Sequence, residues 1–265
     1  MYNAIDIHGH FGDPSCFPQK GLEKEFMRLD LEQLKAEYDR QQISAACLSP
    51  MEAIFPADEI TLLRANDYMA ELARTCDWLY QWVVVDPLLP ASYQQAEALL
   101  PERKCAGVKI HPDAHGYPIR EWGDEIFAFC QEHGAVLETH SGEPMSMPED
   151  MVPFADKYPG VRVIAAHLGF GSDGCVEHQV RAIQEAKHGN IYTDVSSSRS
   201  ILNHLVEWAV DQVTADKLLF GTDTPLHHIA MMKQRVEYAN IPEAAKEAIF
   251  HGSALRLLGD RLAPC

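Results

Sequence analysis

Short apolar runs alternate with longer amphipathic segments along nearly the whole chain. The short runs are rich in β-branched residues, which is typical of strands buried in a parallel sheet. In the longer segments apolar residues recur three or four positions apart, as on one face of a helix. The pattern predicts eight strands, at Ala4–His8, Ser44–Leu48, Leu79–Val85, Gly107–His111, Val136–His140, Arg162–His167, Ile191–Val195 and Lys217–Asp223.

A helix is expected in each interval between these strands. Asp30 followed by Gln33 forms a cap signal for the first helix. The second carries one apolar stripe, and a final helix is expected at Glu243–Leu258. The apolar stripe of the second helix consists of Leu62, Ala65, Met69, Leu72 and Cys76. The other helices are expected to be centred near Glu97, Phe127, Phe154, Ile183, Leu205 and Val236.

Strands that alternate with helices imply a parallel sheet with right-handed crossovers. Eight such units in 265 residues favour an α/β fold of the closed (β/α)8 TIM-barrel type over an open doubly wound sheet. No composition break divides the chain, so residues 1–265 are expected to form a single domain. The longest strand-to-helix loops, Gly12–Leu29 and Pro50–Asp58, are expected to form a lid or a pocket wall.

Composition narrows the class of partner. The 22 basic and 39 acidic side chains give a formal charge of −17, which argues against a nucleic-acid partner. No apolar run approaches the ~20 residues of a membrane span, and the first residues lack the layout of a signal peptide. Seven cysteines without a C-x-x-C pair indicate reduced thiols. We therefore expect a cytoplasmic protein with a small-molecule partner, and a homo-oligomer is left open.

The end of the first strand carries a His-x-His pair. His8 and His10 are two residues apart, so both are expected to face the barrel interior while Ile5 and Ile7 face the helices. Gly9 is expected to let the backbone approach a bound ion closely. A His-x-His pair also arises by chance in a chain with 13 histidines, so the pair alone decides nothing.

Three other strands also end in imidazole or carboxylate groups, at His140, His167 and Asp223. Each has a plain structural alternative, because Asp223 could cap a helix and His167 could be a core histidine. Together with the first strand they would meet at the mouth of the barrel. Convergence of this kind is what the ligands of a catalytic divalent ion require.

The segments IDIHGH, GVKIHP, LETH, AAHLG and FGTDTP, in this order, resemble the amidohydrolase superfamily. More closely, they are similar to the amidohydrolase-related branch that includes aminocarboxymuconate semialdehyde decarboxylase. The resemblance implies a divalent metal, with zinc expected and manganese or nickel as alternatives, bound by His8, His10, His140 and Asp223. It also implies catalytic roles for Asp223, which handles a proton, and for His167, which faces the substrate.

Lys109 leaves two alternatives open. In two-metal relatives a lysine at this position is carboxylated and bridges the ions, and His140 and His167 would then hold the second metal. Alternatively, Lys109 is a protonated side chain that pairs with Glu138 on the adjacent strand or faces the substrate. Substrate contacts are also expected from His111, Arg199 and Arg28, and an arginine is suited to clamp a carboxylate.

The resemblance leaves more than one reaction open. A hydrolase of a small amide, ester or lactone is expected first, because the related decarboxylases tend to be longer, with larger insertions. The alternative is non-oxidative decarboxylation of an unsaturated or aromatic acid. A metal-dependent deoxyribonuclease is disfavoured by the net charge and by Lys109 at a position where those enzymes carry glutamate. A non-catalytic binding protein is disfavoured because all the expected ligands are present.

Overall fold

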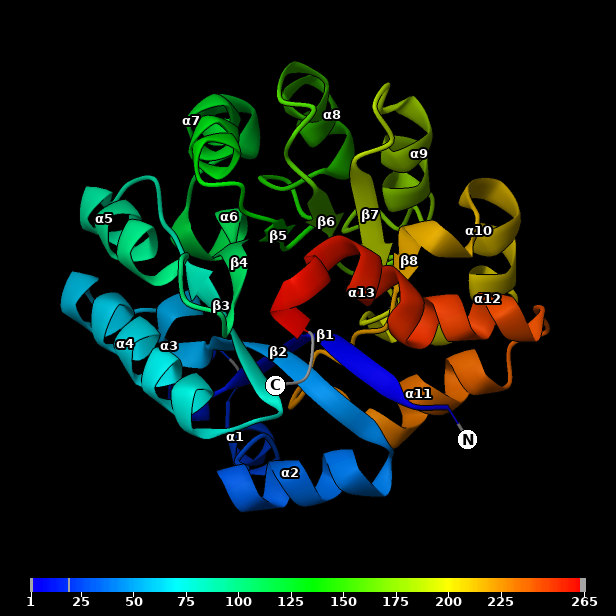
Figure 1. Cartoon of the computed structure of the whole chain (residues 1–265), viewed down its shortest axis with the longest axis horizontal. Coiled ribbons are helices and arrows are strands. Elements are labelled where there is room, and N and C mark those ends of the chain that lie inside the picture. The colour runs from blue at the N-terminus through cyan, green and yellow to red at the C-terminus, as the bar shows by residue number, and fades with distance from the viewer. Residues whose placement is uncertain (1, 19, 263–265) are drawn as a thin grey trace.

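Eight parallel strands form a barrel with helices packed around it (Figure 1). The computed structural model describes residues 2–18 and 20–262. The strands are hydrogen-bonded in sequence order from β1 to β8. This confirms the predicted single-domain TIM barrel. The strands are β1 (Ala4–Phe11), β2 (Ile43–Pro50), β3 (Leu79–Val84), β4 (Cys105–Ile110), β5 (Leu137–Thr139), β6 (Val163–Ala165), β7 (Ile191–Asp194) and β8 (Leu218–Leu219).

Every interval between strands contains at least one helix, as the amphipathic segments predicted. Asp30 and Gln33 form the expected capping box at the start of α2. The described helices are α1 (Leu22–Phe26), α2 (Leu31–Arg40), α3 (Met51–Ile54), α4 (Glu59–Thr75), α5 (Pro90–Leu99), α6 (Pro112–His115), α7 (Ile119–Glu132), α8 (Pro148–Lys157), α9 (His178–Glu185), α10 (Leu205–Val213), α11 (Ile229–Glu237), α12 (Glu243–Glu247) and α13 (Ser253–Leu258). None of these helices is both long and apolar enough to cross a membrane.

The barrel closes between β1 and the segment that follows β8. The regular pairing of β8 ends at Leu219, four residues before the predicted end at Asp223. Beyond it the backbone bonds to β1 instead, with Thr222 N and Asp223 N both donating to His8 O at 3.1 and 2.8 Å. His10 N donates to Thr224 O at 2.7 Å. These bonds fix Asp223 beside the two histidines of β1.

Apolar side chains pack on both faces of the sheet, in two separate clusters. The larger lies between the sheet and the helices. The smaller fills the barrel interior and includes Ile5, Ile7, Trp82, Ile164 and Leu219. In it α13, which crosses the barrel in Figure 1, packs against the strand starts. The opposite end of the barrel, where the strands finish, is therefore left for the functional groups.

The alternation predicted for the first strand is wrong. A register shift between Asp6 and Gly9 breaks it, so Ile5 and Ile7 face the barrel interior rather than the helices. Asp6 instead accepts a hydrogen bond from Tyr38 of α2 at 2.9 Å. Gly9 does not make room for an ion, because a Cβ atom there would lie 2.8 Å from Leu48.

The final helix also differs from the expectation. Residues 243–258 form α12 and α13 joined by a π-helical turn at Ala248–Gly252, instead of one continuous helix. Among the cysteines, the six that the structure describes are free, and Cys47, Cys105 and Cys130 are buried. Cys265 lies outside the described residues.

Candidate active site

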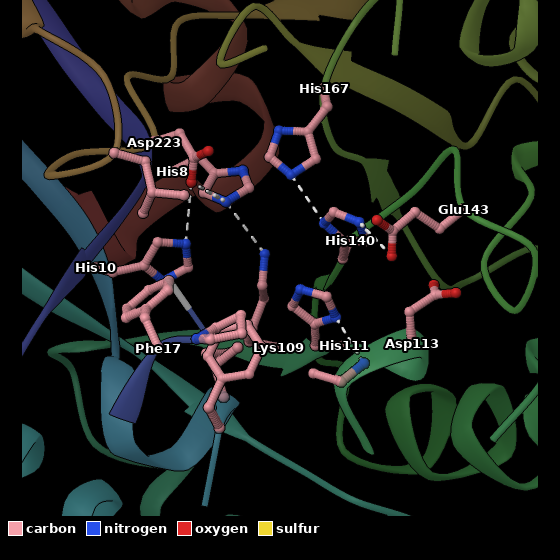
Figure 2. A pocket seen from close by; sticks show the side chains of 15 residues that line it. His8, His10, Phe17, Lys109, His111, Asp113, His140, Glu143, His167 and Asp223 are labelled. Atoms are coloured by element: carbon pink, nitrogen blue, oxygen red, sulfur yellow. Dashed lines mark hydrogen bonds and ion pairs between the residues drawn. The ribbon is translucent and has the colours of Figure 1, made fainter. Parts of the chain in front are cut away.

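A pocket of about 320 Å³ lies at the mouth of the barrel (Figure 2). Both long loops contribute walls to it, through Phe17 and Pro18 from the first and Ile54 and Phe55 from the second. The strand ends and the segments just after them contribute much of its polar lining, namely His8, His10, Lys109, His111, His140, His167 and Asp223. The structure thus brings together most of the residues that the sequence singled out.

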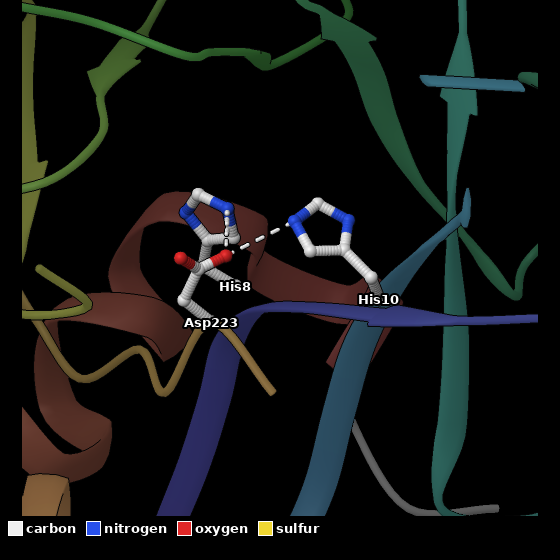
Figure 3. Close-up of side chains that lie close together, drawn as sticks. All are labelled: His8, His10 and Asp223. Atoms are coloured by element: carbon white, nitrogen blue, oxygen red, sulfur yellow. Dashed lines mark hydrogen bonds and ion pairs between the residues drawn. The ribbon is translucent and has the colours of Figure 1, made fainter. Parts of the chain in front are cut away.

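Three of the four expected metal ligands share one corner of the pocket (Figure 3). The Nε2 atom of His10 lies 3.1 Å from Asp223 Oδ1, and Nε2 of His8 lies 3.5 Å from the same oxygen. One donor atom from each residue falls within a 4.8 Å group. Two imidazole nitrogens and a carboxylate oxygen that meet at one point form a suitable donor set for a divalent metal ion.

The far nitrogen of each ligand imidazole is held by a polar partner. His8 Nδ1 lies 2.9 Å from Asp194 Oδ2, and His10 Nδ1 lies 2.7 Å from Ser49 Oγ. Glu138 Oε1 is also 2.9 Å from His8 Nδ1, but only the contact with Asp194 has hydrogen-bond geometry. Partners of this kind orient metal-binding histidines, because they fix the ring and direct Nε2 towards the position of the ion.

The charge of this corner calls for a cation. The carboxylates of Asp194, Asp223 and Glu138 and the ammonium of Lys109 are at most 6% exposed. Burial lowers the pKa of His8, but the carboxylates of Glu138 and Asp194 outweigh burial and raise it to about 10. When His8 is in the neutral form that binds a metal, three buried carboxylates against one ammonium leave an excess of two negative charges, which a divalent ion would balance. The residues present therefore fit a divalent metal.

The neighbouring histidines also shift the pKa values of the carboxylates of Asp194 and Asp223. Burial raises the pKa of Asp194, but the positive charge and the hydrogen bond of His8 outweigh burial, and the pKa is low. Burial also raises the pKa of Asp223, but the hydrogen bond from His10 leads the opposing effects, and this pKa is low as well. Both side chains are therefore ionised at neutral pH and available as acceptors.

Two candidate catalytic residues have strained backbones. His167 has a φ of 74° and Asp223 a φ of 55°, in the left-handed region that side chains rarely adopt. Hydrogen bonds hold both conformations, since His167 N donates to Asp194 Oδ1 at 3.0 Å and Asp223 N donates to His8 O at 2.8 Å. Strain supported in this way is typical of functional sites.

His140, the fourth expected ligand, does not join the group formed by His8, His10 and Asp223. Its Nδ1 lies 3.0 Å from Nε2 of His167. Its Nε2 is buried and has no hydrogen-bond partner among the described residues. An imidazole nitrogen left in this state is available for a ligand.

Lys109 points into the barrel, as predicted, between the metal corner and β5. Its Nζ lies 3.3 Å from His8 Nε2 and 3.5 Å from Glu138 Oε1. Lys109 is paired in register with Glu138 across the two strands. This contact is the one that the ion-pair alternative for Lys109 describes.

The two arginines proposed as carboxylate clamps lie elsewhere. Arg28 is about half exposed and pairs with Asp13 at 3.4 Å, and Arg199 is exposed outside the pocket lining. His111 does line the pocket, and its ring stacks on His140 with centroids 4.0 Å apart.

Sequence reasoning missed several pocket residues. Asp113 and Glu143 line one wall, and Asp194 orients His8 behind another. Asp194 ends β7, and the sequence indicates this position near the barrel mouth, but not that the side chain orients His8. Glu143 follows β5 in a loop, where no periodic pattern reports which way a side chain points.

Solved structures similar to this chain share its barrel along nearly the full length. A 2,6-dihydroxybenzoate decarboxylase from Rhizobium is 15% identical, with a TM-score of 0.78, covering 97% of this chain and 99% of that chain. The 5-carboxyvanillate decarboxylase LigW from Sphingomonas paucimobilis is 16% identical, with a TM-score of 0.76 and coverage of 97% and 98%. A dihydroxybenzoic acid decarboxylase from Polaromonas, with bound manganese and 2-nitroresorcinol, is 18% identical, with a TM-score of 0.77 and 97% coverage of both chains. At these identities the likeness establishes the fold.

These comparisons correct the expectation of a hydrolase. Most of the similar structures are dihydroxybenzoate and carboxyvanillate decarboxylases, which favours the alternative reaction. The argument from length fails, because the match covers 97–99% of the three decarboxylases named above. The expectation of zinc is not supported either, since the Polaromonas enzyme binds manganese.

The match to a protein-family model extends over nearly the whole barrel. No curated protein matches the sequence. A family model described as amidohydrolase matches residues 5–259, from β1 to the end of α13. The match includes all the strand ends that line the pocket. The chain therefore belongs to this amidohydrolase family and is an enzyme of the amidohydrolase superfamily.

Proposed function

We propose that this enzyme is a metal-dependent, non-oxidative decarboxylase of an aromatic carboxylic acid. The observation that carries the proposal is the belt of rings around the pocket. Phe17 and Phe55 lie 4.8 Å apart between ring centroids, Phe55 and His111 lie 5.6 Å apart, and His111 stacks on His140. Such a belt suits a flat, conjugated ring. The likeness to aromatic acid decarboxylases supports the same reaction.

The metal would be held by His8, His10 and Asp223. Imidazole and carboxylate donors suit manganese as well as zinc, and we propose manganese because a similar decarboxylase binds it. When bound, the ion supplies Lewis-acid chemistry that polarises the oxygens of the substrate.

The chain's own residues can perform the remaining steps. The Lys109 ammonium is placed to pair with the substrate carboxylate, in a corner that is otherwise rich in acceptors. In the reaction the bond from the ring to the carboxylate breaks, carbon dioxide leaves, and a proton takes its place on the ring carbon. Asp223, which is ionised at neutral pH, is suited to relay that proton from solvent to the ring carbon, because its carboxylate faces the pocket and can take the proton up transiently. His167, bonded to Ser196 at 2.8 Å and to His140, completes the polar floor.

The test is release of carbon dioxide from carboxyl-labelled hydroxybenzoates by the manganese-loaded enzyme, with the arene product measured in parallel. The His167→Ala variant should keep its metal and lose turnover, since His167 lies outside the group of His8, His10 and Asp223. The exposed His188→Ala variant is the matched control and should behave as the parent enzyme. A metal-loaded enzyme that releases no carbon dioxide from any aromatic acid would contradict the proposal.

A further inference from the structure

Two sides of the pocket carry side chains of opposite charge. On one side stands Lys109, which is 1% exposed, next to the metal corner. On the other side stand the carboxylates of Asp113 and Glu143, away from His10 and Asp223 (Figure 2). One oxygen from each of these two carboxylates lies within a 4.8 Å group that includes a nitrogen of His140. A substrate that fills the pocket meets a cation on one side and anions on the other.

The two carboxylates differ in what they already bind. Asp113 Oδ1 accepts a hydrogen bond from Met145 N at 3.0 Å, and its Oδ2 accepts one from the Ser146 hydroxyl. Asp113 is thus committed to holding the loop after β5. Among the described residues, Glu143 Oε2 has only a longer contact, 3.6 Å to His140 Nε2, and its side chain is 37% exposed. Glu143 is therefore the carboxylate that can accept a hydrogen bond from a ligand.

Glu143 carries a negative charge at neutral pH. Its side chain is 37% exposed, so solvent supports the ionised carboxylate. A second carboxylate placed beside it would be repelled, whereas an amino or hydroxyl group would donate a hydrogen bond to it. Glu143 would therefore discriminate between substrates by its charge and not by the shape of the pocket.

We propose that Glu143 is a specificity-determining residue that selects a hydrogen-bond donor on the substrate ring. This inference rests on the proposed function and names its substrate class. The substrate is a single-ring acid with one carboxylate directed at Lys109 and an amino or hydroxyl group directed at Glu143. Aromatic dicarboxylates are rejected, because their second carboxylate would face Glu143.

The proposal is tested by ligand binding rather than by turnover alone. Dissociation constants for the manganese-loaded enzyme are measured by calorimetry with 3- and 4-aminobenzoate, 3- and 4-methylbenzoate, and benzene-1,3- and 1,4-dicarboxylate. The parent should bind one aminobenzoate about tenfold to a hundredfold more tightly than the matching methylbenzoate and dicarboxylate, the range expected for hydrogen bonds to a charged group.

Variants then assign the preference to Glu143. Glu143→Gln should lose most of the discrimination against the dicarboxylate, since the repelling charge is gone, while metal content stays at the parent value. Glu132→Gln, at an exposed position at the end of α7, removes one negative charge outside the pocket and should change nothing. Unchanged selectivity in Glu143→Gln would overturn the inference.

Two further outcomes are distinguishable. Metal analysis that finds two ions per chain, one of them lost in Glu143→Gln, would place a second ion at Asp113, His140 and Glu143 and overturn the inference. Donor-selective binding without any release of carbon dioxide would instead contradict the proposed reaction and leave the role of Glu143 supported. Release of carbon dioxide with a substrate preference that is the same in the parent and in Glu143→Gln would support the proposed reaction and contradict the role of Glu143.

Discussion

The two sides of the pocket are built differently. On the metal side, His8, His10 and Asp223 are at most 6% exposed, and each is tied to neighbouring strand ends. On the other side, His140 and Glu143 are partly exposed and stand at or beyond the end of a strand. The first side is preorganised to bind an ion in one geometry. The second can be altered without disturbing the barrel, which is where substrate selection would be expected to lie.

The largest effect should come from breaking the metal side. His10→Ala removes one of the two imidazole donors and should abolish stoichiometric metal and turnover together. Loss of activity by more than about a thousandfold is expected, because the chemistry depends on the ion. Elemental analysis of the purified variant measures the metal. If the variant retained one ion per chain, the assignment of this corner as the metal site would be wrong.

The next effect concerns the ion pair beneath the metal. Lys109→Ala should leave one metal per chain but lower the free energy of unfolding by about 3 kcal/mol, because Glu138 would remain as an unpaired buried charge. Chemical denaturation of the metal-loaded protein measures this loss. Adding Glu138→Gln should recover part of it, since the buried charge disappears.

The same variant separates the two models for Lys109. If Lys109 is protonated, adding bicarbonate should not change the activity of the parent enzyme. Metal lost on mutation, or activity that depends on bicarbonate, would indicate a carboxylated lysine that bridges two ions. The structure places Lys109 Nζ 3.5 Å from Glu138 Oε1.

A smaller effect is expected from the residue that orients His8. Asp194→Asn keeps the size of the side chain but removes the charge that holds His8 Nδ1. Metal affinity should fall by about tenfold to a hundredfold, the usual range for partners that orient a ligand. Chelator competition measures the affinity, and a thermal melt checks that the fold persists. Equal affinity in parent and variant would show that Asp194 only supports the backbone of His167.

Much of this pocket was predictable because it stands on strands. The period of the strands placed Lys109 inward and set it beside Glu138, as the structure shows. The strand ends likewise indicated His8, His10 and Asp223, although the contacts of Asp223 depend on an irregular segment after β8 that no periodicity describes.

The sequence failed where geometry departs from the regular strand or where a loop decides. The register shift between Asp6 and Gly9 leaves Ile5 and Ile7 inside the barrel rather than against the helices, and no residue type announces such a shift. Arg28 was assigned to the pocket because it lies in the first long loop and an arginine can clamp a carboxylate, but it pairs with Asp13 at the surface instead. The acidic wall was missed for a related reason, because Glu143 belongs to a loop whose path depends on tertiary contacts.

The smallest expected effect concerns the tether of that loop. Asp113→Asn weakens the hydrogen bonds to Met145 N and to Ser146, and should lower the unfolding free energy by about 1 kcal/mol. For a chain of this size that corresponds to a fall of about 2 °C in Tm. Metal content should not change, because Asp113 lies on the opposite side of the pocket. Aminobenzoate binding should weaken about threefold, since a looser loop places Glu143 less well. Calorimetry on the parent and the variant, both loaded with manganese, measures this change. A loss of metal in this variant would show that the two sides of the pocket are mechanically coupled, because the loop would then be supporting the ligands as well as the substrate wall.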